Sequence, residues 1–451
     1  MIKDLDDYNK FIENKKHTTN NFGFEPIWYP DIMFDFQRHI VDHSMKKGRI
    51  GIFADTGLGK TMMSLTIANN IILKTNKRVL ILTPLAVSFQ FIDEANKIGI
   101  DDIEYSKDGK YSKKIVICNY ERLHYFNSDD FEAVILDESS ILKNFNGQIK
   151  NSITSFIKKV NYRFLTTATP SPNDYIELGT SSEALGYMGY MDMLSKFFKN
   201  NQNSVDSNNR NIGEKFYLKP HAEKSFFQWV NSWSIMVKKP SDIGYNDDRY
   251  KLPKLITNTH IVENDDIFIK VAKTMSEIKR EQKNTEKQRC KKAIELAYDK
   301  TSVYWCNTNS ESGFIKSNDK EAVEIIGSQT IEQKEEILKA FADGEIKRLI
   351  TKAKMTSQGL NWQHCNHSVF FPTWSYEQYY QAIRRFWRFG QKNDVVIDLV
   401  LSEGMTRVMD ALQQKTQKAQ DLYENLVLNV NEVYKEDIKK HSVIMTKPNF
   451  I

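Results

Sequence analysis

Short apolar runs alternate with helical spacing through the first half of this 451-residue chain. Each run is rich in aliphatic and β-branched residues and stops at proline, glycine or a polar residue, which is typical of buried parallel strands. Segments between the runs, such as TMMSLTIANNIIL, have the spacing of amphipathic helices. The alternation predicts an α/β domain built on a parallel sheet. Its predicted strands are residues 49–54, 78–84, 114–120, 131–138 and 162–170.

The second half repeats the alternation and predicts a second α/β domain. Residues 225–237 have helical spacing, and a polar segment over 266–298 predicts a long helix. Basic residues in that segment are mixed with glutamates, so a solvated face is favoured over contact with nucleic acid. These basic residues are Lys279, Arg280, Lys283, Lys287, Arg289, Lys291 and Lys292. The predicted strands of this half are residues 302–307, 321–327, 347–353, 367–372 and 395–401.

The two halves suggest a domain organisation. The polar residues 199–215 are interpreted as a loop or an insertion, because they lack any hydrophobic period. The predicted parts are an N-terminal extension (1–29), a first domain (30–237), a linker (238–256), a second domain (257–403) and a helical tail (404–451).

Composition narrows the class of protein. Hydrophobic residues make up 40% of the chain and charged residues 27%. These proportions are typical of soluble globular proteins and exclude a disordered chain. The net charge is only +5, so any surface that binds nucleic acid must be a local basic patch. Four scattered cysteines favour a reducing compartment. Because no apolar signal segment or membrane span is recognisable, we expect a cytoplasmic protein without membrane contact.

The stretch ADTGLGKT, residues 54–61, fits a phosphate-binding loop, with Ala54 where the first glycine is usual. It follows a predicted strand and opens a predicted helix, which is the context that this motif requires. Backbone N–H groups of such a loop bind the β- and γ-phosphates, a lysine adds positive charge, and a hydroxyl reaches Mg²⁺. The candidate nucleotide-binding residues are Thr56, Gly57, Gly59, Lys60 and Thr61, with Thr61 also a metal ligand.

Two adjacent carboxylates, Asp137 and Glu138, end the apolar run AVILDE. An aspartate at the carboxyl end of a strand suits Mg²⁺, and a neighbouring glutamate suits the polarisation of an attacking water. An apolar strand that ends in Asp-Glu is common by itself. After a phosphate-binding loop, the pair indicates nucleotide hydrolysis.

The stretch QAIRRFWRFGQ, residues 381–391, gathers Arg384, Arg385 and Arg388 within one and a half turns of a predicted helix. Clustered guanidiniums repel one another unless an anion lies among them. Arginines from a second domain stabilise the charge that develops in phosphoryl transfer. We therefore expect the two α/β halves to close on ATP. The alternative is a helix end whose arginines are paired with acidic residues.

Taken in order, these motifs resemble those of superfamily-two helicases, and within them the Swi/Snf-type DNA translocases. The resemblance covers roughly residues 30–430 and is that of a compact motor core of phage or bacterial type. The motifs that carry it are FDFQRHIV (34–41), ADTGLGKT (54–61), LTPLAVSFQ (82–90), VICNYERL (116–123), LDESSILKN (136–144), TTATPSPND (166–174), GSQTIEQKEEILKAF (327–341), TKAKMTSQGLNWQ (351–363) and WSYEQYYQAIRRFWRFGQ (374–391).

The resemblance implies a fold and a set of site residues. The fold is α/β, with two tandem RecA-like P-loop NTPase domains, an ATP cleft between them and a C-terminal helical tail. It implies that Gln37 reads adenine, and that Gln381, Arg385 and Arg388 join Asp137 and Glu138 in catalysis. The nucleic-acid contacts that it implies are Thr83, Asn119, Tyr120, Gln329, Thr330, Thr356 and Ser357.

The function implied is that of a Mg²⁺- and ATP-dependent motor, a DNA-dependent ATPase or helicase that moves along duplex or branched DNA. The alternatives are a branch-migrating helicase for forks and junctions, and a nucleotide-switched DNA clamp or motor subunit that needs a protein partner. An RNA helicase is disfavoured by Lys143-Asn144 after the acidic pair. One departure is Ser140, which replaces the residue that couples hydrolysis to movement in many relatives. Aromatic residues near the arginines, such as Trp387, are expected in the core, with base stacking as the alternative.

Overall fold

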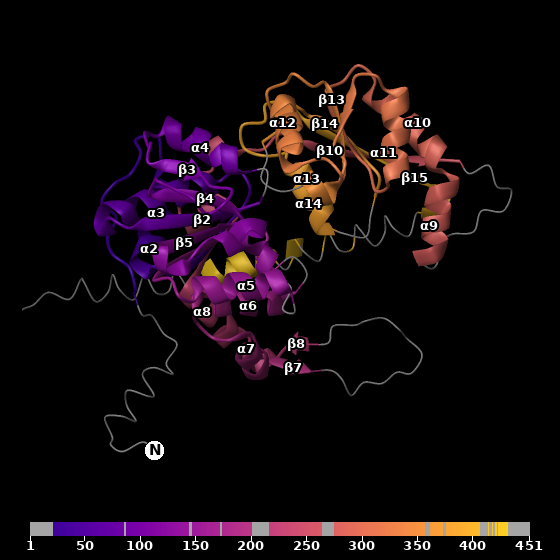
Figure 1. Ribbon diagram of the computed structural model, residues 1–451. Helices are drawn as coiled ribbons and strands as arrows, with labels where there is room; N and C mark the ends of the chain where they lie inside the picture. Colours follow the sequence, from indigo (N-terminus) through magenta and orange to yellow (C-terminus); the bar gives the residue numbers. More distant parts are fainter. Residues whose placement is uncertain are drawn as a thin grey trace, which may run out of the picture. The chain divides into compact units, whose positions relative to one another are not determined.

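The fold is described from a computed structural model (Figure 1). The described residues are 21–84, 87–143, 147–171, 174–200, 216–263, 275–356, 361–372, 376–405, 414, 417, 420–421 and 423–431. Two compact units divide them. The first draws on segments 1–83, 91–247 and 422–451, and the second on segments 84–90 and 248–421.

A seven-stranded parallel sheet forms the centre of the first unit. Its strands are β1 (Arg49–Ala54), β2 (Arg78–Thr83), β3 (Ile103–Tyr105), β4 (Ile115–Asn119), β5 (Phe131–Asp137), β6 (Tyr162–Thr167) and β9 (Ser234–Val237). Their spatial order is β3-β4-β2-β5-β6-β1-β9, and every neighbouring pair is parallel. All the strands predicted for this half are confirmed, because their apolar runs are buried on both faces of the sheet.

Helices cover both faces of this sheet. They are α2 (Asp35–Lys47), α3 (Lys60–Thr75), α4 (Ser88–Lys97), α5 (Gln148–Ile157), α6 (Leu178–Leu185), α7 (Tyr190–Phe197) and α8 (Glu223–Trp233). On one face, α5 to α8 pack their apolar side chains against Leu80, Val116 and Val134 of the sheet. Side chains alternate along a strand, so Ile81 and Ile135 point to the other face, where α3 packs.

The predicted helix over 225–237 is wrong at its end. Helix α8 stops at Trp233, and the following residues form the edge strand β9 beside β1. The sequence SIMV is rich in residues that suit a strand, and all four side chains are buried in the sheet. A short antiparallel hairpin, β7 (Phe198–Asn200) with β8 (Phe216–Leu218), flanks the predicted insertion. Most of that insertion, residues 201–215, lies outside the described residues.

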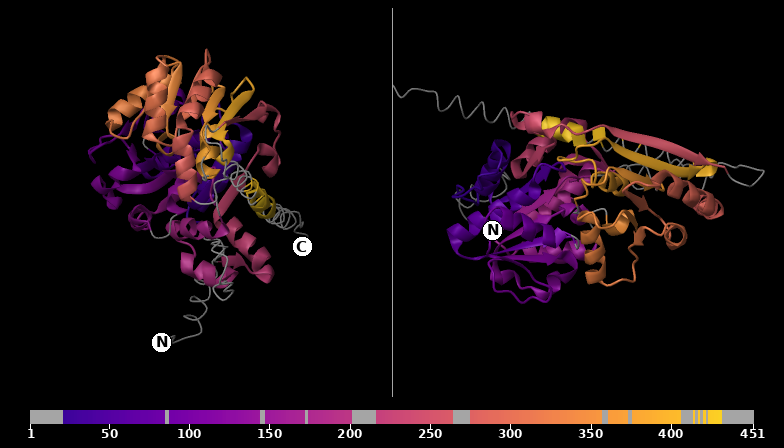
Figure 2. Two further views of the ribbon diagram at one scale, coloured as in Figure 1. Left: turned by 90° about the vertical axis from the view of Figure 1, so that its right-hand side faces the viewer. Right: turned by 90° about the horizontal axis from the view of Figure 1, so that it is seen from above.

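The second unit contains a six-stranded parallel sheet. Its strands are β10 (Leu255–Val262), β11 (Ser302–Trp305), β12 (Ala322–Glu324), β13 (Arg348–Thr351), β14 (His367–Phe370) and β15 (Val395–Ser402), in the spatial order β10-β15-β14-β11-β13-β12. The strands predicted for this half are confirmed. The edge strand β10, which was not predicted, runs parallel to β15 over its whole length, and the two are visible side by side in Figure 2.

The helices of the second unit are α9 (Met275–Asn284), α10 (Glu286–Ala297), α11 (Asn309–Asn318), α12 (Ile331–Ala342), α13 (Ala353–Thr356) and α14 (Tyr376–Ile383). The long helix predicted for 266–298 is therefore divided at Thr285, and residues 264–274 lie outside the described part. Among the described residues, no helix is both long and apolar enough to cross a membrane.

Arg289 corrects part of the basic pattern noted in the sequence. Its side chain is fully buried and forms an ion pair with Glu311 at 2.7 Å. Its other N–H groups donate to the carbonyl of Gln282 and the hydroxyl of Thr285. A guanidinium satisfied in this way holds α10 against α11 and is unavailable to a phosphate.

A buried polar network joins four strands of the second unit. Both oxygens of Asp398 accept hydrogen bonds, from His367 at 2.8 Å on one side and from His260 and Asn258 at 3.0 and 2.9 Å on the other. The other ring nitrogen of His367 lies 2.6 Å from the hydroxyl of Ser302. Burial raises the pKa of the Asp398 carboxyl, but these hydrogen bonds outweigh it and hold the pKa well below its usual range.

The chain returns to the first unit at its C-terminal end. Residues 423–431 are helical, and the yellow helix lies among the magenta helices of that unit (Figure 1). Leu426, Val427 and Val430 are buried in the core formed by α5 to α8. The hydroxyl of Tyr423 donates to the backbone carbonyl of Phe53 at 3.3 Å. This helix therefore belongs to the same core as the sheet.

We predict that Leu426→Ala destabilises the first unit by about 2–5 kcal/mol, because it removes a fully buried side chain and leaves a cavity. Leu428 of the same helix is 62% exposed, so Leu428→Ala is the matched control and should cost less than about 0.5 kcal/mol. Urea denaturation, combined with hydrogen exchange of peptides from β1 and β6, measures both. Equal stability of the two variants would contradict the packing of this helix.

The stability of the second unit at low pH depends on the carboxyl of Asp398. Because the pKa of Asp398 is lower in the folded than in the unfolded state, its stabilisation is complete above the unfolded value and is lost as the pH falls below it. The second unit should therefore weaken steeply below about pH 4, and Asp398→Asn should flatten that slope. Asp343→Asn, at an exposed carboxyl of the same unit, should leave the slope unchanged. Urea denaturation across this pH range tests the prediction, which fails if the wild type and Asp398→Asn share one slope.

Candidate nucleotide-binding and hydrolysis site

The phosphate-binding loop connects the carboxyl end of β1 to the first residue of α3. Gly57 and Gly59 adopt φ angles of 85° and 83°, which residues with a side chain rarely adopt. The amino group of Lys60 donates to two backbone carbonyls of the loop, those of Ala54 at 2.9 Å and Asp55 at 3.2 Å. The structure thus brings the predicted loop residues together around one turn.

The hydroxyl residues of the loop lie at its two ends. The backbone N–H of Thr56 donates to the carboxylate of Asp55 at 2.7 Å, which fixes the first turn of the loop. Thr61 is the second residue of α3 and is partly exposed. Both positions suit the contacts predicted for them.

Gln37 lies in the first turn of α2, directly against the loop. Its side-chain N–H donates to the carbonyl of Leu58 at 2.9 Å, and its carbonyl accepts from the N–H of Phe34 at 3.1 Å. A Cβ atom added at Gly59 would lie 2.2 Å from the Gln37 amide nitrogen. Gln37 therefore supports the loop itself, and its contact with adenine stays a prediction.

The acidic pair lies at the carboxyl end of β5. Asp137 is only 8% exposed, and Glu138 follows it outside the strand. Burial, and then the neighbouring charge of Glu138, raise the pKa of Asp137 to about 6, although Lys60 and a hydrogen bond from Thr166 act in the opposite direction. Burial and the neighbouring carboxyl therefore disfavour the charged form of Asp137 more than Lys60 and Thr166 favour it.

This donor set fits Mg²⁺. A partly compensated, buried carboxylate is stabilised by a divalent cation, and Mg²⁺ in nucleotide sites uses one or two carboxylates together with substrate phosphates. In the described part of the chain, no three His, Cys, Asp or Glu side chains form a metal cluster, so a site made by protein ligands alone is not found there. Asp137 and Thr61 are the residues that would hold the ion.

Sequence reasoning missed the function of Thr166, the second-last residue of β6. Its hydroxyl lies 3.1 Å from Asp137 Oδ1 and 3.3 Å from the carbonyl of Leu136. The motif TTATP marked this position, but only strand pairing between β5 and β6 shows which carboxylate the hydroxyl contacts.

Three of the predicted nucleic-acid contacts lie inside the first unit. The side chains of Thr83, Asn119 and Tyr120 are buried, so they present no exposed surface to a strand in this structure. The hydroxyl of Tyr120 donates to the backbone carbonyl of Asp137 at 2.6 Å. The structure therefore gives Tyr120 a different task, which is to hold the end of β5.

The other predicted contacts belong to the second unit. Gln329 and Thr330 lie before α12, where the Thr330 hydroxyl caps the helix by accepting from the N–H of Gln333. Thr330 is exposed and Gln329 is half-buried. Ser357 and the side chain of Thr356 lie outside the described residues.

A helix was predicted for the arginine cluster, and this prediction is wrong. The arginines lie beyond the end of a helix. Helix α14 ends at Ile383, and the chain continues in tight turns because the N–H groups of Arg385 and Phe386 donate to carbonyls only three residues back. The carbonyl of Arg385 accepts from the N–H of Trp362, which ties this turn to the segment before β14. The side chain of Phe386 is buried in the core and anchors it.

The predicted catalytic residues of this cluster lie close together. Gln381 and Arg385 are buried, and the Nε of Arg385 donates to the carbonyl of Gln381 at 3.3 Å, while Arg388 is half-buried. The guanidinium of Arg384 lies over the rings of Tyr380 and Trp387, with 5.1 and 4.6 Å to the ring centroids.

Trp387 packs within the second unit. Its indole N–H donates to the carbonyl of Pro253 at 2.7 Å, and the guanidinium of Arg384 lies over its ring. These contacts favour the structural interpretation of this aromatic residue over base stacking.

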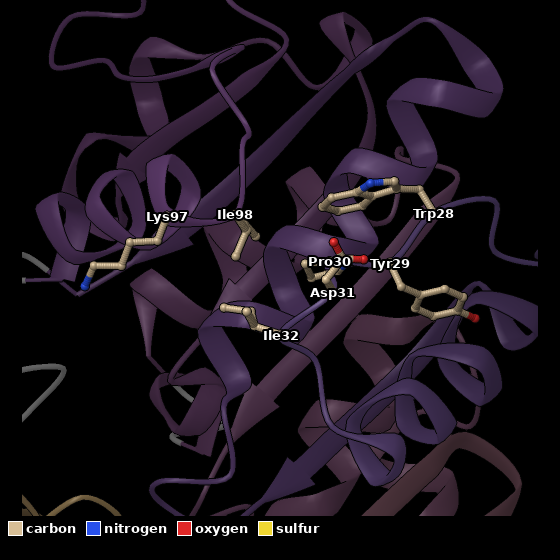
Figure 3. Close-up of a pocket in the computed structure, with 7 residues that line it drawn as sticks. All are labelled: Trp28, Tyr29, Pro30, Asp31, Ile32, Lys97 and Ile98. Atoms are coloured by element: carbon tan, nitrogen blue, oxygen red, sulfur yellow. The ribbon is translucent and has the colours of Figure 1, made fainter.

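A pocket of about 240 Å³ lies on the first unit, lined by residues 28–32 together with Lys97 and Ile98 (Figure 3). None of its lining residues belongs to the phosphate-binding loop or to the acidic pair.

The fold and the site define a P-loop ATPase with two tandem RecA-like domains. Residues 34–178 match the DEAD/DEAH box helicase family, and residues 285–390 match the helicase conserved C-terminal domain. The chain is thus a superfamily-two helicase, an ATP-hydrolysing motor that acts on nucleic acid. No sequence among curated proteins matches it.

The chain also matches two solved structures over most of its length. The SWI2/SNF2 ATPase core of Sulfolobus solfataricus in complex with dsDNA is 15% identical, covers 92% of this chain and 98% of its own, and gives a TM-score of 0.41. A variant of S. cerevisiae Dbp5 bound to RNA and ADP BeF3 is 12% identical, covers 86% of this chain and 93% of its own, and gives a TM-score of 0.53. At this identity the second similarity concerns the fold alone.

We predict that Gly59→Ala raises the Kd for ATP at least about tenfold, because the new methyl group strains the backbone and displaces the Gln37 amide. Gly99→Ala is the matched control: its φ of 76° gives the same strain, but a Cβ there has no heavy atom within 4 Å. Equilibrium titration with a fluorescent ATP analogue measures both variants. Equal affinity in the two would show that contact between Gln37 and the loop does not matter for binding.

Proposed function

We propose that this helicase is a DNA translocase, which uses ATP hydrolysis to move along duplex or branched DNA without reading its sequence. The observation that carries the catalytic part is the convergence of the Lys60 loop and the carboxylates of Asp137 and Glu138 at one edge of the first sheet. The DNA part is supported by the sequence pattern, namely Lys143 after the acidic pair and the spacing of Gln381, Arg385 and Arg388.

In the proposed reaction, Lys60 and the loop N–H groups hold the β- and γ-phosphates. Asp137 and Thr61 would hold Mg²⁺, which would neutralise charge on the phosphates. The oxygen of a water molecule bonds to the γ-phosphorus while Glu138 accepts its proton. The bond from the γ-phosphorus to the bridging oxygen breaks, and ADP leaves with that electron pair. Arg385 and Arg388 stabilise the developing charge when the two domains close on ATP.

A motor that holds its track by phosphate contacts binds without sequence preference and loses affinity as salt rises. ATPase should therefore be stimulated by DNA of any sequence, with a steep dependence on ionic strength. A preference for a four-way junction over a blunt duplex would favour the branch-migrating form of the same motor.

The test is steady-state ATPase with no nucleic acid, single-stranded DNA, blunt duplex, a four-way junction and RNA, at two salt concentrations. We expect strong stimulation by duplex or junction in the wild type. Lys60→Ala and Glu138→Gln should reduce the stimulated rate to background, since each removes a group required for phosphoryl transfer. Circular dichroism of both variants checks that they remain folded.

Stimulation by RNA alone would overturn the proposed substrate. ATPase that stays low with every nucleic acid until a protein partner is added would favour a partner-dependent switch. Turnover retained in Glu138→Gln would remove Glu138 as the base.

A further inference from the structure

Glu138 has an unusual backbone for a residue with a side chain. Its φ is 55°, in the left-handed region, which costs on the order of 1 kcal/mol for a residue other than glycine. Such conformations persist where the surrounding structure holds them, and they concentrate at functional sites.

Two hydroxyl groups donate to the same carboxylate oxygen. Ser140 Oγ lies 2.8 Å from Glu138 Oε1, and Thr167 Oγ1 lies 2.7 Å from the same atom. Ser140 and Thr167 are buried, so these donors are not competing with bulk water. Among the described residues, none donates to Oε2, which leaves that oxygen for a water molecule.

One of these donors is linked to the segment that follows β6. The N–H of Thr169 donates to Thr167 Oγ1 at 3.0 Å, and Thr167 in turn donates to Glu138. A hydroxyl that accepts one hydrogen bond and donates another is fixed in direction. The Thr167 hydroxyl therefore directs its own proton toward the Glu138 carboxylate.

We propose that Ser140 and Thr167 are positioning residues for hydrolysis. Their hydroxyls hold Oε1 of Glu138 so that Oε2 faces the attacking water. This inference rests on the proposed function of Glu138 as the base. It gives Ser140, which departs from the helicase pattern, a defined task.

The neighbouring serine provides a matched control. Ser139 is 1% exposed and Ser140 is 4% exposed, so the two are buried to the same extent. The Ser139 hydroxyl has no hydrogen-bond partner within the described part of the chain. Removal of that hydroxyl should therefore change little, whereas removal of the Ser140 hydroxyl releases one side of the carboxylate.

The experiment compares Ser140→Ala, Ser140→Thr, Ser139→Ala, Thr167→Ala and Thr167→Ser in the full chain. It measures kcat and KM for ATP with the most stimulating nucleic acid, the Kd of a fluorescent ATP analogue, and the thermal midpoint. We expect kcat to fall about 10- to 100-fold in Ser140→Ala and Thr167→Ala, which is the scale of a hydrogen bond to a charged group. The Kd should change less than about twofold, because neither hydroxyl is predicted to contact ATP.

Rescue separates positioning from packing. Ser140→Thr and Thr167→Ser keep the hydroxyl and should recover most of the rate, and Ser139→Ala should behave as the wild type. The inference is overturned if Ser140→Ala and Ser139→Ala have the same kcat, or if the loss appears in the Kd or the thermal midpoint instead. A wild type without ATPase activity under any condition would overturn the proposed function as well, so the two failures are distinguishable.

Discussion

The parallel pairing of β6 with both of its neighbours is the constraint on which the nucleotide site depends. Phe53 of β1 pairs with Thr167, and Asp137 of β5 pairs with Thr166. Parallel strands end at the same edge of a sheet, so the loop after β1 and the carboxylates after β5 converge there. The two threonines at the end of β6 lie between them. A slip of one residue would turn each side chain to the opposite face and separate the hydroxyls from the carboxylates.

Two buried aspartates show how neighbours decide the chemistry of the same group. Burial, and then the charge of Glu138, raise the pKa of Asp137, whereas at Asp398 three hydrogen bonds outweigh burial and lower the pKa. A carboxylate of the first kind is short of positive charge, which is a property expected where a cation and phosphates are to bind. A carboxylate of the second kind is already satisfied and acts as a structural element of its sheet.

The sequence predicted the elements whose signal is local. Continuous apolar runs identified the sheet strands of both units apart from β3, β9 and β10, and the loop motif identified the residues around Lys60. Strand β9 was not predicted because SIMV follows a helical pattern without a break. Strand β10 was not predicted because an exposed edge strand lacks an apolar run. Contacts between side chains that are distant in the sequence were not predicted either. Only the fold shows that Tyr120 supports Asp137, or that Arg289 faces a glutamate 22 residues further on instead of solvent.

The serine at position 140 contacts the acidic pair from within its own turn. Its side chain is short and donates within its own turn, to the carboxylate two residues earlier. Among the described residues, the hydrogen bond of its hydroxyl is made to Glu138. Thr167 reaches the segment after β6, through the N–H of Thr169. Because both hydroxyls meet on Oε1, the loss of either one leaves that oxygen with a single donor from Ser140 or Thr167. In the part of the chain that the structure describes, the Thr167 hydroxyl thus links the N–H of Thr169 to the carboxylate of Glu138.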